Sequence, residues 1–97
     1  MTPSVPIFQS VVISSSAQIG VTGERKIWKV CLAGGSAASK LELKNAATDT
    51  GDVLFTLNAL TNDYKSESFS DVGSIPFSTA CYAKLSGTGA LAYVWYE

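Results

Sequence analysis

The side chains in this sequence that could take part in catalysis or bind a metal are two thiols, Cys31 and Cys81, and eight carboxylates. The chain contains no histidine. The lack of histidine removes the commonest general base, the usual zinc ligand, and the triads that activate serine or cysteine. Two cysteines alone are too few ligands for a structural zinc site. No glycine-rich phosphate loop with lysine and serine or threonine occurs. These features predict a protein that is not an enzyme and has no cofactor.

One fragment, Asp49-Thr50-Gly51, matches the catalytic signature of aspartic proteases. In those enzymes, two carboxylates from apolar loops share one proton. Here the fragment lies between Thr48 and Asp52, in a polar setting typical of a turn, and Asp52 would add a like charge. We therefore interpret it as a turn that joins two strands and reject the protease.

Calcium and carbohydrate are two further ligands that the residue types allow. The aspartates in predicted turns lack the spacing of an EF-hand loop, so no metal site is predicted; they are Asp49, Asp52, Asp63 and Asp71. Six aromatic side chains could form a sugar-stacking platform, although core packing is the simpler explanation. They are Trp28, Tyr64, Tyr82, Tyr93, Trp95 and Tyr96.

The two cysteines are predicted to be free, buried thiols in a reducing compartment. Alternation places Cys31 on the same face as Ile27 and Lys29. It places Cys81 on the same face as Ala83. A small secreted domain would often carry four or more cysteines in pairs.

Composition limits the classes of partner. The 97 residues fit one domain, and the net charge of −1 comes without a basic cluster, so nucleic-acid binding is not expected. The apolar runs are far shorter than the ~20 residues that span a bilayer, and no signal-peptide pattern opens the sequence. Only 15% of residues are charged, against ~25% in typical domains. The low charge indicates that part of the surface is covered by something other than water.

Apolar and polar residues alternate with period two along most of the chain, and no window shows a helical stripe. The predicted strands are residues 7–14, 25–33, 39–46, 53–58, 63–70, 80–86 and 90–96. Glycine- and serine-rich turns separate them. The pattern predicts an all-β fold, a single small antiparallel β-sandwich of about seven strands, either jelly-roll-like or immunoglobulin-like. We expect an extended N-terminal arm over residues 1–8 and the sandwich domain over 9–97.

Three details of the strands are also predicted. In segment 25–33, Trp28, Val30 and Leu32 share one face. Segment 63–70 is an edge strand, where charged residues discourage unwanted strand pairing. Segments 80–86 and 90–96 form a hairpin around the turn at residues 87–89.

Two parts of the chain are candidates for contact with a partner. The last strand has two apolar faces, with Tyr93 and Trp95 on one and Val94 and Tyr96 on the other. One face packs on the core, and the second is available to the rest of the fold or to a partner. The arm combines prolines with large apolar residues. The predicted interface residues are Pro3, Pro6, Ile7, Phe8, Tyr93 and Trp95.

The order of motifs over residues 27–97 resembles small virion proteins of tailed phages. The matching pieces are Cys31-Leu32-Ala33-Gly34-Gly35, Leu41-Glu42-Leu43, Thr50-Gly51-Asp52-Val53-Leu54-Phe55-Thr56-Leu57, Ile75-Pro76-Phe77-Ser78-Thr79, Tyr82, Leu85-Ser86-Gly87-Thr88-Gly89-Ala90 and Tyr96-Glu97. The sequence departs from the class at Ser74, which separates Gly73 from Ile75. It also departs at Ala80, where glycine is common.

The resemblance implies a non-enzymatic structural protein of a phage particle. The leading hypothesis is a capsid decoration or cement protein that binds the major capsid protein and other copies of itself, for example as a trimer. It would be located in the virion and assembled in the host cytoplasm. A small tail or adhesin component and a carbohydrate-binding β-sandwich module are the alternatives. Such virion proteins have no catalytic residues to transfer.

Overall fold

The computed structural model describes residues 9–69 and 73–97, and in these residues every regular element is a β-strand. The strands are β1 (Gln9–Ile13), β2 (Ala17–Ile19), β3 (Arg25–Ala33), β4 (Ser39–Lys44), β5 (Val53–Ala59), β6 (Tyr64–Ser68), β7 (Ile75–Phe77), β8 (Cys81–Ser86) and β9 (Leu91–Tyr96). All seven predicted strands are present, with ends shifted by up to two residues. Two strands of three residues each, β2 and β7, were not predicted because they are too short for alternation to be recognised. The predicted arm lies outside the described residues.

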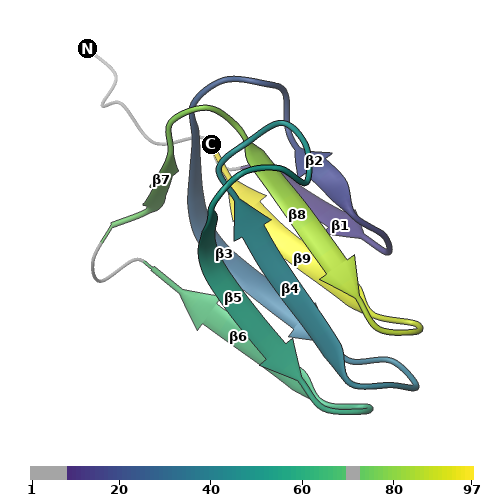
Figure 1. Cartoon of the computed structure of the whole chain (residues 1–97). Helices are drawn as coiled ribbons and strands as arrows, with labels where there is room; N and C mark the ends of the chain where they lie inside the picture. Colours follow the sequence, from purple (N-terminus) through teal and green to yellow (C-terminus); the bar gives the residue numbers. More distant parts are fainter. Residues whose placement is uncertain (1–8, 70–72) are drawn as a thin grey trace.

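The strands form two antiparallel sheets that stack face to face (Figure 1). Sheet A has the order β1-β9-β3-β6, with β7 also paired to β3, and sheet B has the order β2-β8-β4-β5. Strands from the two ends of the chain therefore alternate within each sheet. This order is that of a jelly roll, in which two Greek keys wrap around one core. The all-β sandwich prediction is confirmed, and the immunoglobulin-like alternative is wrong.

The predicted terminal hairpin is wrong. Residues 87–90 do connect β8 to β9, but β8 pairs with β2 and β4 in sheet B, while β9 pairs with β1 and β3 in sheet A. The connection is therefore an arch between the two layers. A short glycine-containing turn is compatible with either arrangement, and only the pairing partners distinguish them.

The prediction that Trp28, Val30 and Leu32 share one face of β3 is partly wrong, because a β-bulge interrupts the alternation of this strand. The pairing of β3 with β9 shifts register between Ile27 and Lys29, so Trp28 is the extra residue. Ile27 belongs to the core together with Val30 and Leu32. Trp28 is neither in the core cluster nor packed against it. The bulge thus turns Trp28 to the outer side.

The core is a single layer of apolar side chains between the sheets. In β4, Leu41 and Leu43 are fully buried, whereas the alternating residues Lys40, Glu42 and Lys44 are not, as predicted. The largest fully buried side chains are Phe77, Ile19, Ile27, Leu32, Leu41 and Leu43. Both cysteines are free and buried, as predicted, but only Cys81 belongs to the core cluster.

At one end of the sandwich (Figure 1), the β3–β4 loop is hydrogen-bonded to the β5–β6 and β8–β9 connections. Gly34 N donates to Asp63 O (2.8 Å), and Ser36 N donates to Thr88 O (3.0 Å). A side chain at Gly34 or Gly35 would overlap the backbone of the neighbouring loops. The close approach of these loops therefore requires glycine at both positions.

We expect Gly35→Ala to destabilise the protein by at least ~2 kcal/mol, because its Cβ would overlap the backbone of Thr88 and Gly89. Urea unfolding monitored by tryptophan fluorescence measures this change. Ser36→Ala is the matched control and should change stability by less than ~0.5 kcal/mol, since it removes one long, exposed hydrogen bond. Equal stability of the two variants would contradict the packing described for this end.

Candidate functional site

The outer side of sheet A is apolar and aromatic. Residues that pair across strands share a face, and the rows that alternate with the core residues point outward. One outward row joins Val12, Tyr93, Cys31 and Ser66. A second joins Ser10, Trp95, Lys29 and Ser68, so serines stand at the ends of both rows. We call this surface the aromatic face. Its residues are Val12, Trp28, Lys29, Cys31, Ala33, Tyr64, Leu91, Tyr93 and Trp95.

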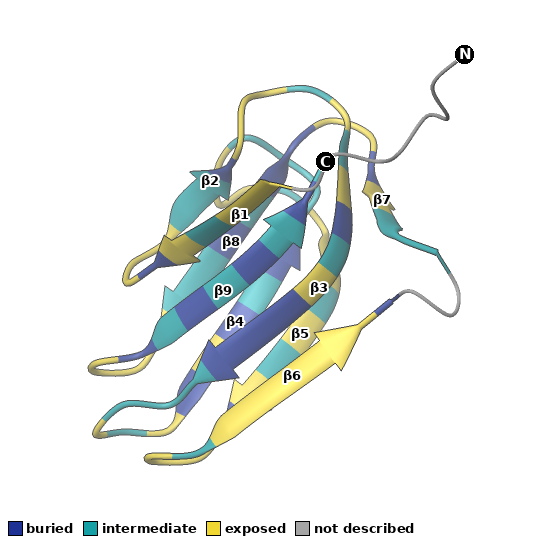
Figure 2. Ribbon diagram, turned by 180° about the vertical axis from the view of Figure 1, so that it is seen from behind, coloured by how far each residue is buried: buried dark blue, intermediate teal, exposed yellow. Residues whose placement is uncertain are grey.

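The structure places two of the sequence-predicted interface residues, Tyr93 and Trp95, side by side on one strand of the aromatic face. Both are half-buried, whereas Tyr64 at the rim is 58% exposed. Figure 2 shows sheet A in front, with β6 exposed along its whole length. The other predicted interface residues, Pro3, Pro6, Ile7 and Phe8, lie outside the described residues.

Contacts within the aromatic face fix its side chains. The Lys29 ammonium group lies 5.2 Å from the ring centre of Trp95, a cation–π contact. The Trp28 indole donates a hydrogen bond of 2.8 Å to the Glu97 carboxylate. These contacts hold both tryptophans on the surface of the sheet, which lowers the entropy that would be lost on binding.

Cys31 lies at the centre of the aromatic face, beneath Tyr64. The Tyr64 hydroxyl donates to Cys31 Sγ at 3.1 Å, and this hydrogen bond raises the pKa of Tyr64. Cys31 is only 1% exposed although it points away from the core. The sequence indicated two buried thiols but not this arrangement, because the pairing of β6 with β3 joins residues far apart in the chain.

The outer side of sheet B has the opposite character. Its outward rows contain polar and charged residues, with Tyr82 as the aromatic one. They are Gln18, Lys40, Glu42, Lys44, Thr56, Asn58, Tyr82, Lys84 and Ser86. The two broad surfaces of the sandwich therefore differ in chemistry: one is solvated and charged, and the other is aromatic.

Asp49 belongs to the polar side. It forms ion pairs with Lys44 and, at 3.4 Å, with Lys84, and it lies in the exposed turn between β4 and β5. The hydrogen bond from Lys44 lowers the pKa of Asp49. An aspartic protease needs a carboxyl in an apolar loop that retains a proton. The geometry therefore agrees with the turn that we predicted for Asp49-Thr50-Gly51.

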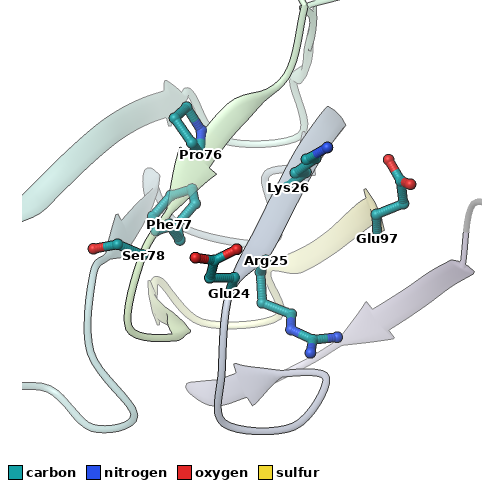
Figure 3. Close-up of a pocket in the computed structure, with 7 residues that line it drawn as sticks. All are labelled: Glu24, Arg25, Lys26, Pro76, Phe77, Ser78 and Glu97. Atoms are coloured by element: carbon teal, nitrogen blue, oxygen red, sulfur yellow. The ribbon is translucent and has the colours of Figure 1, made fainter.

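A pocket of about 300 Å³ lies where β3 begins, next to β7 and the end of β9 (Figure 3). It is lined by Glu24, Arg25, Lys26, Pro76, Phe77, Ser78 and Glu97. Two carboxylates balance two cations, so the pocket has no net charge. Arg25 Nε is buried there without a hydrogen-bond partner among the described residues. No motif in the sequence indicated this pocket, apart from the adjacent cations Arg25 and Lys26.

Within residues 9–69 and 73–97, no group of three or more cysteine, aspartate or glutamate side chains could hold a metal ion. Asp71, one of the four turn aspartates, lies outside that part. The same residues contain no helix long and apolar enough to cross a membrane.

The six aromatic residues considered for sugar stacking are divided by the fold. Tyr96 is 8% exposed and belongs to the core, and Tyr82 lies on the polar side. The other four gather on the aromatic face, so core packing does not account for them. They are Trp28, Tyr64, Tyr93 and Trp95.

Asp49→Asn should lower stability slightly at pH 7, with the difference from wild type vanishing near pH 2. The folded-state pKa of Asp49 is lowered from an ordinary value of 3.8, so its ionised form is favoured by folding. Such a contribution is present above the ordinary pKa and is lost as the pH falls through the folded value. Urea unfolding at both pH values measures it.

The control for this experiment is Asp52→Asn, which removes a neighbouring carboxylate. Asp52 accepts a hydrogen bond through its backbone carbonyl, which the substitution retains. A pH-independent effect of Asp49→Asn would show that the ion pairs do not contribute.

Removal of the Tyr64 side chain should expose one thiol. We expect Tyr64→Ala to raise the rate at which a thiol reagent labels Cys31 by on the order of tenfold or more. Cys81 should stay unreactive, because burial in the core raises its pKa to about 12. Tyr82→Ala, on the opposite side of the sandwich, is the control. Labelling of both thiols, or of neither, in Tyr64→Ala would contradict the arrangement.

Comparisons with known proteins find only distant structural similarity. No family model matches the chain, and no curated protein matches it. Among solved structures, the tobacco streak virus coat protein matches with a TM-score of 0.40 and 8% identity over 99% of this chain and 90% of that one. A virus-like particle protein of the extra small virus of the giant freshwater prawn Macrobrachium rosenbergii matches with a TM-score of 0.38 and 12% identity, over 98% and 82%. At these scores the likeness carries no argument about function.

Proposed function

We propose that this protein is a non-enzymatic structural component of a virus particle, namely a decoration protein on the head of a tailed phage. In this proposal it binds the major capsid protein through the aromatic face and associates with other copies of itself. It is assembled in the host cytoplasm and remains in the virion. The observation that carries the proposal is the contrast between the aromatic and the polar side of one small sandwich.

The chemistry of the aromatic face suits burial against another protein. The cores of interfaces are enriched in tyrosine and tryptophan and depleted in charge. The outward rows described above carry one charge, Lys29, whose ammonium group already contacts Trp95, and the Glu97 carboxylate at their end already accepts the hydrogen bond of Trp28. Tryptophan and tyrosine are also the residues that most often dominate binding energy. A decoration protein needs such a surface and no reactive group.

The remaining support is by analogy. The sequence resembles small phage virion proteins over residues 27–97. The jelly roll is a common architecture of viral capsid proteins, although one fold serves many functions. Many copies on a regular shell also bind with combined strength, so each contact can be weak. A small tail component would use the same surface.

Carbohydrate binding is the second candidate, because four aromatic side chains share one exposed side and jelly rolls include lectins. One contact disfavours it. The Lys29 ammonium group lies over the Trp95 ring, where a sugar would stack. The same face also offers few hydrogen-bonding groups beyond serines such as Ser10 and Ser66.

Trp95→Ala should weaken binding to the particle by ~30-fold or more, the effect expected for an interface tryptophan at the centre of a contact. The assay is co-sedimentation of the purified protein with shells of the phage that encodes it, prepared without this protein. Tyr82→Ala is the matched control, since it removes an aromatic side chain from the polar side. It should bind like wild type.

Three outcomes separate the candidates. Loss of binding in Trp95→Ala but not in Tyr82→Ala supports the proposal. Absence of the protein from purified virions by mass spectrometry would overturn it. A specific signal on a glycan array that disappears in Trp95→Ala would favour the carbohydrate-binding alternative.

A further inference from the structure

The strand β5 forms an outer edge of sheet B, and it carries no charged residue. Its sequence, Val53–Ala59, is the longest edge strand among the described residues. Of the strands in residues 9–69 and 73–97, only β4 pairs with it, so the backbone groups along its other side have no strand partner there. Exposed edges of this kind pair readily with strands of other chains unless something prevents it.

The other three edges are shorter or guarded. β6 ends sheet A on the same flank, as predicted for an edge strand, and it carries Lys65 and Glu67. These residues pair with Leu32 and Val30, so they project toward the inner side of the sheet, a known protection against strand addition. On the opposite flank, β1 has five residues and β2 has three. β5 has no such inward charges; its one irregularity is a β-bulge at Leu54 near the start of the strand, which leaves Phe55–Ala59 regular.

Exposed apolar side chains concentrate near this edge. Val53 and Leu54 are each 43% exposed, and Leu60, directly after the strand, is 70% exposed. On the inner side, Phe55 and Leu57 pack against the core but stay half-buried at its margin. Phe55 makes an edge-to-face contact with Phe69, with ring centres 5.2 Å apart. The margin of the core is therefore left open along β5.

We propose that β5 pairs antiparallel with β5 of a second copy of this chain, about a twofold axis at Thr56. The two four-stranded sheets then form one continuous eight-stranded sheet. Thr56 is the midpoint of Val53–Ala59, and an axis there pairs Phe55 with Leu57, two residues that lie beyond the bulge at Leu54. The contact is isologous and closes at a dimer.

A second copy fits this edge because the strand is complementary to itself. In the proposed register, Phe55 lies opposite Leu57 of the second copy on the inner side, which closes both open margins of the core. On the outer side, Thr56 lies opposite Thr56, a favourable cross-strand pair. No charge of β5 meets a like charge. Seven residues per copy make a small contact, so we expect a weak dimer, with a Kd in the micromolar range or above.

The dimer surface is separate from the aromatic face. β5 belongs to sheet B, whereas the aromatic face belongs to sheet A. A dimer of this kind leaves Trp95 and Tyr93 free to contact a particle. The inference deepens the self-association in the proposed function by naming its surface, and it does not depend on particle binding by the aromatic face.

The test is Thr56→Lys, analysed by sedimentation velocity from ~1 µM to ~1 mM. Two lysines would face each other across the axis, which should weaken the dimer by at least ~10-fold. The monomer should stay folded, because residue 56 lies opposite Glu42 of β4 on the solvated side of the sheet. Circular dichroism verifies folding. Gln18→Lys, which adds the same charge at the other edge of sheet B, is the control and should dimerise like wild type.

Opposite charges placed at residue 56 of the two copies test the register of the proposed β5–β5 pairing. Thr56→Glu should also be monomeric, and an equimolar mixture of Thr56→Lys and Thr56→Glu should form heterodimers that native mass spectrometry detects. Independently, Thr56→Cys should form a disulfide-linked dimer under mild oxidation, whereas Gln18→Cys should not.

Several results would overturn the inference. They are a wild-type protein that stays monomeric at ~1 mM, a dimer that Thr56→Lys does not weaken, and trimers or open filaments in place of dimers. Trp95→Ala should leave dimerisation unchanged. Loss of particle binding with an intact dimer would refute the proposed function alone, and the reverse would refute this inference alone.

Discussion

Two stacked sheets must bury one face each against the other, and everything else in this molecule depends on that constraint. The core is one layer of side chains, so alternate residues of each strand are committed to it, such as Leu41 and Leu43 in β4. The residues between them cannot reach the core. Their chemistry is therefore free to differ between the two outer sides, and here one is charged while the other is aromatic.

The bulge at Trp28 shows how a single residue changes a surface. With regular alternation, Trp28 would share a face with Val30, and Ile27 would point outward. The extra residue reverses the phase, which places Ile27 in the core and Trp28 beside Glu97. Both tryptophans thus reach the same outer side. Trp28 joins the aromatic face because β3 departs from regular geometry at this point.

The two surfaces proposed for association lie on different sheets of the sandwich. The aromatic face covers the flat side of sheet A, and β5 borders sheet B. A protein with a flat binding side and a pairing edge can contact a shell and a neighbouring copy at the same time. Such an arrangement suits a particle component, in which weak contacts repeated many times give stable attachment. Lys65 and Glu67 on β6 confine strand pairing on that flank to β5.

The sequence by itself determined seven of the nine described strands, the inner and outer rows of β4, the division of β9 into two rows, the two free thiols and the turn at Asp49, because alternation and turn residues are local properties. It did not determine which strands pair. The turn at residues 87–89 therefore suggested a hairpin where the fold has an arch between sheets. The jelly-roll order, the bulge at Trp28 and the meeting of Tyr64 with Cys31 were decided by the tertiary structure. Each depends on contacts between residues far apart in the chain, which no local pattern encodes.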